Sequence, residues 1–206
     1  MLVIGLTGSI ATGKSEAAKL FAGAGVPVFD ADAEVHALYK ESMITDILAR
    51  YFPEAVIGGE VDRQALGKIV MGDPAKLKTL EALIHPLVRS KREEFIAKWK
   101  QKNARFVVLD IPLLYETGQA GDVDFVVVVS APENVQRERA LLRPGMTDEK
   151  LAAIRLRQLP DFEKRSRADF VIENSGGLDQ LREQVGALVA GFEAMSREAN
   201  HERNRP

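Results

Sequence analysis

The chain has 206 residues, 46% of them hydrophobic, which suffices to bury a core in one domain with a small subdomain. Its lack of cysteine excludes disulfides, thiolate metal sites and a cysteine nucleophile, and its formal net charge of −2 provides no overall attraction to nucleic acid or to a membrane surface. No apolar segment approaches the roughly 20 residues that span a bilayer, and the N-terminal apolar run has no basic flank, so we expect a soluble, cytoplasmic protein without a signal peptide.

The first predicted element is a strand over residues 2–7, which leads directly into a glycine-rich loop and a helix. The loop has the spacing G-x-x-x-x-G-K-[ST], in which Gly8 and Gly13 let consecutive backbone N–H groups curl around an anion. Lys14 supplies a charged donor to the β- and γ-phosphates of a nucleotide, and the Ser15 hydroxyl is placed to bind Mg²⁺. The strand before the loop and the helix after it indicate a phosphate loop, to which the helix adds the positive end of its dipole.

A second strand is predicted over residues 25–29, and it ends in two carboxylates, Asp30 and Asp32. Because side chains alternate along a strand, both carboxylates lie on one side if strand geometry continues. A carboxylate opposite the phosphate loop can accept the proton of an attacking hydroxyl or hold Mg²⁺ through water. Capping of the next helix is the alternative role for either of them, and we favour Asp32 for the chemistry.

Residues 33–102 show a helical pattern of apolar residues, and this stretch is much longer than a simple crossover between strands requires. We therefore expect a helical insertion that forms a wall of the substrate site. Within it, His85 precedes Pro86, which predicts a helix end at His85 rather than a ligand. His36 lies beside the two aspartates, and its role is open between structure and function.

Later elements complete an alternation of strands and helices, which predicts a parallel sheet with ligands bound at the carboxyl ends of its strands. These elements are three strands at 106–110, 124–130 and 171–172 and a last helix at 178–195. Asp110 ends one strand at the position of a Walker B carboxylate, and the alternative is a simple turn residue. The tail over 196–206 is polar, and we expect it to fray.

The segment 136–167 differs from the rest of the chain in charge, since it holds nine basic and five acidic residues. Arg139 and Arg143 are four residues apart and therefore neighbours on one helix face, and Arg155 and Gln158 are three apart. Arginine donors on a closing lid would neutralise the charge of a phosphoryl transition state. The alternative is a solvated helical face held by salt bridges.

An ordered set of motifs across residues 1 to about 192 resembles the dephospho-CoA kinase family. The set comprises residues 6–15, Asp30-Ala31-Asp32, Leu83-Ile84-His85-Pro86, Pro112-Leu113-Leu114-Tyr115-Glu116, Gln136-x-x-Arg139, Arg155-x-x-Gln158 and Ala168-Asp169-Phe170-Val171-Ile172-x-Asn174. The phosphate loop alone is common to many nucleotide-binding proteins, whereas the ordered set is highly specific.

The resemblance implies an α/β fold like that of nucleoside monophosphate kinases: a P-loop three-layer α/β/α arrangement with a five-stranded parallel sheet, a helical insertion and a small helical lid. Its parts would be a nucleotide-binding core (1–32, 103–135 and 168–196), a helical substrate domain for the CoA moiety (33–102), an arginine-rich lid (136–167) and a polar tail (197–206). It also implies ATP-dependent phosphorylation of the ribose 3′-hydroxyl of dephospho-CoA, the last step of coenzyme A synthesis, with Mg²⁺.

The resemblance further implies roles for single residues. Asp32 would be the base, Lys14 and Arg139 would stabilise the moving phosphoryl group, and Ser15 would bind Mg²⁺. Asp110 is a second candidate for Mg²⁺ from its position at the strand end, not from the resemblance. The residues implied at ATP are Gly8, Ala11, Thr12, Gly13, Lys14, Ser15, Glu16, Arg143 and Asn174, and those at dephospho-CoA are Asp32, His85, Leu113, Leu114 and Glu116.

The chain departs from many family members at three positions, where Ala11, Glu16 and Tyr115 replace Gly, Thr and Phe. Ala11 is small enough to keep the loop. Glu16 places a carboxylate in the first helical turn, where it favours the helix dipole and repels phosphate.

Two other classes of function stay open at this point. One is a kinase of another nucleoside monophosphate or small metabolite, and the other is a regulatory nucleotide-binding switch, although the guanine-reading sequence Asn-Lys-x-Asp is absent. A nucleic-acid partner is disfavoured because the basic residues are confined to one segment without interleaved aromatics. We expect ATP and dephospho-CoA as the small-molecule partners, no membrane partner, and a monomer, with an oligomer as the open alternative.

Overall fold

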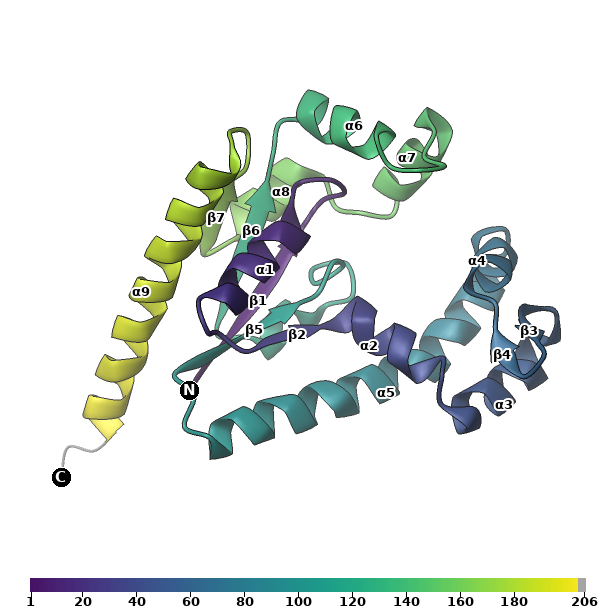
Figure 1. The fold of residues 1–206 in the computed structure, drawn as a ribbon, viewed down its shortest axis with the longest axis horizontal. Coiled ribbons are helices and arrows are strands. Elements are labelled where there is room, and N and C mark those ends of the chain that lie inside the picture. Colours follow the sequence, from purple (N-terminus) through teal and green to yellow (C-terminus); the bar gives the residue numbers. More distant parts are fainter. Residues whose placement is uncertain (204–206) are drawn as a thin grey trace. The chain divides into compact units, whose positions relative to one another are not determined.

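The computed structural model describes the backbone of residues 1–203 and the side chains of residues 1–199, and the chain divides into two compact units (Figure 1). One unit holds Met1–Phe29 together with the chain from Ile96 onward, and the other holds Asp30–Phe95. The second boundary falls inside a continuous helix, α5 (Pro74–Gln101), because the last turns of that helix pack with the first unit. None of the helices in 1–203 is both long enough and apolar enough to cross a membrane.

A five-stranded sheet forms the centre of the first unit, in the order β2-β5-β1-β6-β7. Its strands are β1 (Leu2–Gly8), β2 (Val28–Asp30), β5 (Phe106–Asp110), β6 (Phe125–Ser130) and β7 (Phe170–Glu173). The central strand β1 pairs in parallel with β5 and with β6, and β6 pairs in parallel with β7. This arrangement confirms the α/β class and the parallel sheet that the sequence predicts.

Helices cover both faces of this sheet, which explains why its central strands are continuous apolar runs. Figure 1 shows α1 (Lys14–Gly23) in front of the sheet, in contact with β1, and α8 (Asp161–Arg167) behind it, in contact with β6. The long helix α9 (Leu178–Arg203) packs against α1, β5 and β7. Its Phe192 is 1% exposed and lies 5.1 Å from the ring of Phe170, edge to face. The sheet is thus held rigidly enough to position the loops at its carboxyl edge.

The last helix is longer than the sequence predicts, since α9 ends at Arg203 rather than at Met195. Ser196 is 2% exposed, and its hydroxyl donates a hydrogen bond of 2.8 Å to the carbonyl of Arg105. Glu193 forms ion pairs with Arg105 and Arg197. These contacts extend the helix by two turns, so the predicted fraying from 196 is wrong for residues 196–203, while 204–206 lie outside the described residues.

The second unit is mostly helical and has its own core. Its elements are α2 (Ala31–Leu38), α3 (Ser42–Tyr51), a short 3-10 helix η1 (Pro53–Ala55), β3 (Val56–Ile57), β4 (Glu60–Val61), α4 (Arg63–Met71) and most of α5. Leu38, Leu48, Phe52 and Ile84 are among its fully buried side chains. The antiparallel pair β3–β4 was not predicted, although the Gly58-Gly59 dipeptide supplies the positive φ angles, 61° and 83°, that a tight hairpin turn needs.

The predicted helix end at His85 is wrong, because α5 continues through Pro86. A proline removes only one hydrogen bond from the helical ladder. In a helix of 28 residues, burial of Leu80 and Ile84 on the core side outweighs that loss. The remaining helices all belong to the first unit: η2 (Gln119–Asp122), α6 (Glu133–Leu141), α7 (Asp148–Arg155) and α8.

Candidate active site

The loop between β1 and α1 has the backbone of a phosphate-binding loop. Gly13 has a φ of 94°, and a Cβ atom there would lie 2.0 Å from Nδ2 of Asn174. At Gly8 a Cβ atom would lie 2.5 Å from the carbonyl oxygen of Val129. Ala11 also adopts a left-handed conformation, with a φ of 60°. Close packing therefore requires glycine at both positions. The left-handed conformations of Ala11 and Gly13 give the backbone the curvature that turns a row of N–H groups toward an anion.

Lys14 begins α1, and its amine forms an ion pair with the carboxylate of Asp110. The register of the sheet explains this contact, since β5, which ends at Asp110, lies directly beside β1. The two side chains are 14% and 5% exposed. Ser15 is exposed in the first turn of the same helix. Glu16 pairs with Lys19 at 3.1 Å, so a cation on its own helix partly neutralises this carboxylate.

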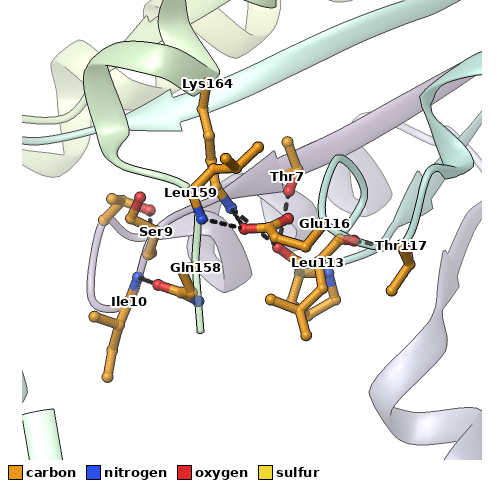
Figure 2. A network of polar contacts seen from close by, with 11 residues as sticks. Thr7, Ser9, Ile10, Leu113, Glu116, Thr117, Gln158, Leu159 and Lys164 are labelled. Atoms are coloured by element: carbon orange, nitrogen blue, oxygen red, sulfur yellow. Dashed lines mark hydrogen bonds and ion pairs between the residues drawn. The ribbon is translucent and has the colours of Figure 1, made fainter. Parts of the chain in front are cut away.

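The outer side of the phosphate loop is tied to residues distant in sequence. Oε1 of Gln158 accepts a hydrogen bond of 2.9 Å from the backbone N–H of Ile10 (Figure 2). Nδ2 of Asn174 donates to the carbonyl of Thr12 at 2.8 Å, and the Arg139 guanidinium donates to the carbonyl of Asn174 at 3.0 Å. The structure thus brings Asn174, predicted at ATP, and Arg139, predicted at the moving phosphoryl group, to the phosphate loop.

A second lysine, Lys164, is completely buried and pairs with Glu116 (Figure 2). Its Nζ lies 2.8 Å from Oε1 of Glu116, which also accepts a hydrogen bond of 2.8 Å from the N–H of Leu159. The carbonyl of Pro112 accepts from the Thr7 hydroxyl at 3.0 Å. The loop after β5 is therefore fixed to the end of β1 and to the segment between α7 and α8.

Several arginines of the basic segment 136–167 form ion pairs with acidic residues of the same unit, as the salt-bridge alternative expects. Their pairs are Arg137 with Asp148 at 2.8 Å, Arg155 with Glu133 at 2.7 Å, and Arg165 with Glu173. The hydrogen bond that Arg165 donates to the Glu173 carboxylate raises the pKa of the guanidinium above its usual value, and burial opposes this shift. Arg143, by contrast, is exposed, and it has no ion pair with any of the described side chains.

Tyr115 lies in the loop after β5, at the position where many family members have Phe. Burial raises the pKa of its hydroxyl, the Asp169 carboxylate raises it further, and Arg167 lowers it. The Arg167 guanidinium lies 5.8 Å from the ring centroid, within the range of a cation–π contact. The Tyr115 hydroxyl is buried without a hydrogen-bond partner among the described residues. It therefore stays protonated at neutral pH and packs largely as Phe would.

A cavity of about 610 Å³ opens on the outer side of the phosphate loop, between the end of β6 and helices α6 to α8. Ser9 Oγ and Asp161 Oδ1 on its wall are buried and have no hydrogen-bond partner within the part of the chain described. Gln158 also lines it. Its other polar lining residues are Ser130, Glu133, Gln136, Arg155, Arg165 and Glu173.

In the second unit, Asp30 and Asp32 have different surroundings. Asp30 is the N-cap of α2, where its Oδ1 accepts a hydrogen bond of 2.9 Å from the N–H of Ala33. Asp32 is exposed in the first turn, and its carboxylate has no hydrogen bond or ion pair among the described side chains and backbone. His36 is half-buried in the last turn of α2. His85 is exposed on α5 and lines a surface hollow of about 520 Å³ together with Lys78, Glu81, Ala82, Pro86, Arg89, Ser90 and Glu93.

Comparison with known proteins connects this geometry to one family. A family model described as Dephospho-CoA kinase matches residues 2–180. The chain belongs to the dephospho-CoA kinase family. Among its relatives, the Dephospho-CoA kinase of Mesorhizobium japonicum is 54% identical, with 92% of this chain and 95% of that protein covered. The Dephospho-CoA kinase of Agrobacterium fabrum is 53% identical, with 92% and 97% covered.

Solved structures agree with membership in the dephospho-CoA kinase family. The crystal structure of TT1252 from Thermus thermophilus superposes with a TM-score of 0.81 at 39% identity, over 92% of this chain and 97% of that one. The Dephospho-CoA kinase from Campylobacter jejuni superposes with a TM-score of 0.70 at 26% identity, over 93% and 97%.

Sequence reasoning missed two features of this dephospho-CoA kinase family member. Lys164 is one of nine basic residues in its segment, and no local pattern indicates that it alone is fully buried. Gln158 belongs to a quoted motif, but its bond to Ile10 spans 148 positions of sequence. Both depend on tertiary packing that residue spacing does not report.

Proposed function

We propose that this chain transfers the γ-phosphoryl group of ATP to the ribose 3′-hydroxyl of dephospho-CoA, which yields coenzyme A and ADP. The observation that carries the proposal is the phosphate loop with Lys14 at its mouth, in a chain of this family. The domain roles expected from the sequence belong to the same proposal: a nucleotide-binding core, a CoA-moiety domain over 33–102 and a lid over 136–167.

For ATP, the loop N–H groups, the N-terminus of α1 and the Lys14 amine supply positive charge where the β- and γ-phosphates lie. Lys14 exchanges its contact with Asp110 for a phosphate oxygen. Arg139 is held by the Asn174 carbonyl beside the loop, which supports its role at the moving phosphoryl group. Arg143 is exposed and has no ion pair among the described side chains, and we propose that it contacts ATP near the adenine.

For Mg²⁺, the residues present suit the ion. The Ser15 hydroxyl is exposed beside Lys14, and the Lys14 contact places the Asp110 carboxylate at the same edge of the sheet. Mg²⁺ prefers oxygen ligands, and few of them come from protein when phosphates and water complete the shell. Residues 1–203 contain no group of three or more acidic or histidine side chains that would form an all-protein cage. The bound ion would neutralise charge on the phosphates.

For the acceptor, Asp32 is the proposed base. The cap made by Asp30 supports this choice, because it leaves Asp32 as the carboxylate with no structural partner in the described chain. A base within hydrogen-bond reach of the ribose hydroxyl removes its proton as the phosphoryl group is transferred. His85, Leu113 and Glu116 are proposed to contact the acceptor, and Leu114, which is fully buried, would support that pocket from behind.

The test measures ADP release with ATP and Mg²⁺, with and without dephospho-CoA, and uses AMP and adenosine as competing acceptors. We expect release to require dephospho-CoA and coenzyme A to be the product. Release driven by another acceptor would indicate a different small-metabolite kinase, and nucleotide binding without any acceptor-dependent release would indicate a regulatory switch. The cytoplasmic location and the monomeric state stay predictions of the sequence.

A further inference from the structure

The phosphate loop packs into the helices that follow β6, rather than standing free above the sheet. Ile10 and Ala11 are 9% and 6% exposed and form an apolar cluster with Ala140 of α6 and Leu151 of α7. Met146 and Ile154 pack around this cluster. Ile10 and Ala11, which occupy x positions of the G-x-x-x-x-G-K-[ST] motif, thus pack the loop against α6 and α7.

The same contact contains one hydrogen bond that fixes the loop backbone. The N–H of Ile10 donates to Oε1 of Gln158. It therefore does not belong to the row of loop N–H groups that would face phosphate. Ala11, next in the chain, has the left-handed conformation that turns the following N–H groups inward. The hydrogen bond from Ile10 to Gln158 therefore fixes the loop at the residue before Ala11, where the backbone becomes left-handed.

Gln158 itself is held in place from the other side. The N–H of the next residue, Leu159, donates to Glu116, whose carboxylate is bound by the buried Lys164 (Figure 2). The short segment between α7 and α8 is thereby fixed to the loop after β5. These bonds anchor this segment, which lies toward the end of the proposed lid, so Gln158 offers the Ile10 N–H a fixed acceptor.

We propose that Gln158 is a positioning residue for ATP: through Ile10, it keeps the N–H groups of the phosphate loop in their binding orientation before nucleotide arrives. Without this acceptor the loop samples other conformations, and ATP binding must then order it, which weakens the affinity. The inference rests on ATP binding to the phosphate loop, which is one half of the proposed function. It does not depend on which molecule receives the phosphoryl group.

The test compares Gln158→Leu, which removes the acceptor at similar size, with Gln158→Glu, which keeps an acceptor for the Ile10 N–H. Calorimetric titration with ATP gives the affinity, and steady-state kinetics give the two KM values. For Gln158→Leu we expect an ATP affinity about 5- to 10-fold weaker, the value of one lost hydrogen bond, with a parallel rise in KM for ATP and an unchanged KM for dephospho-CoA. Gln158→Glu should recover most of the affinity at high salt, where its added charge is screened.

A matched control is Ser196→Ala, which removes a buried side-chain bond to a backbone carbonyl before β5, at the amino end of the sheet. It should leave ATP affinity unchanged. The proposal is overturned if Gln158→Leu binds ATP as tightly as the wild type, if Gln158→Glu is as weak as Gln158→Leu at high salt, or if Ser196→Ala weakens ATP equally. A wild-type chain that binds ATP but does not phosphorylate dephospho-CoA would remove the proposed function and leave this test intact.

Discussion

Two lysine–carboxylate pairs connect residues 110–116, at the end of β5 and in the loop after it, to other parts of the first unit. The two pairs differ in how far the lysine side chain is exposed. Lys14 pairs with Asp110 at the mouth of the phosphate loop, and its side chain is 14% exposed. The Lys164 side chain is 0% exposed and that of its partner Glu116 is 13% exposed, and Glu116 also accepts a hydrogen bond from the Leu159 N–H. A partly exposed amine beside a row of N–H groups can exchange its partner for phosphate, whereas a sealed one cannot. The Lys14 amine is therefore available to a ligand, whereas the Lys164 amine holds the fold, and only the Glu116 carboxylate of that second pair keeps some exposure.

The second unit repeats this contrast with two carboxylates. Asp30 accepts a hydrogen bond from the Ala33 N–H at the start of α2, whereas the exposed carboxylate of Asp32 has no hydrogen bond or ion pair in the described part of the chain. Lys14 and Asp32 are thus the members of each comparison that remain available to substrates, and Lys164 and Asp30 are those used to hold the fold.

The largest effect is expected for Lys14→Ala. Loss of a charged donor at the transferred group lowers kcat by about 10²–10³. Loss of a charged hydrogen bond to bound ATP lowers the affinity for ATP by roughly 10-fold. Steady-state kinetics and nucleotide titration measure the two parts. Wild-type ATP affinity in this variant would contradict the assignment of residues 8–15 as the phosphate loop.

Asp32→Asn comes next, because it keeps the size of the side chain and removes the base. We expect kcat to fall by about 10²–10⁴ while ATP affinity is largely retained. Single-turnover measurement of coenzyme A formation isolates the chemical step. Unchanged turnover would exclude Asp32 from the chemistry.

Lys164→Met should act on stability instead of ATP binding. It leaves the buried Glu116 carboxylate without its cation, which costs about 3–5 kcal/mol in the free energy of unfolding. Urea denaturation measures the loss, and the double variant Lys164→Met with Glu116→Gln should recover part of it because no buried charge remains. ATP affinity lowered as far in Lys164→Met as in Lys14→Ala would erase the distinction between the two pairs.

The smallest effect is expected for Asp30→Ala, which removes the cap of α2. Loss of a helix N-cap costs about 0.5–2 kcal/mol of stability. Thermal denaturation measures this loss, and kcat should change far less than in Asp32→Asn. A larger drop in kcat for Asp30→Ala than for Asp32→Asn would exchange the roles of the two carboxylates.

Much of the fold could be read from local patterns, because the features involved are periodic or short-range. The run of valines in β6, the strand-loop-helix order at residues 2–15 and the alternation of elements sufficed for the parallel sheet. The errors share one cause, which is tertiary packing that overrides a local preference. Burial of Leu80 and Ile84 carries α5 through Pro86, and the Ser196 bond to Arg105 extends α9.

The sequence by itself determined that this protein has an α/β core and a phosphate loop, since glycine spacing, Lys14 and Ser15 act within a few residues of one another. It also specified which residues carry charge. Only the tertiary structure decided how each charge is used: that Lys164 is sealed against Glu116, that Asp30 caps a helix, and that Gln158 supports Ile10. The physical reason is that the solvation and the partner of a polar side chain depend on chain segments that are remote in sequence and adjacent only after folding.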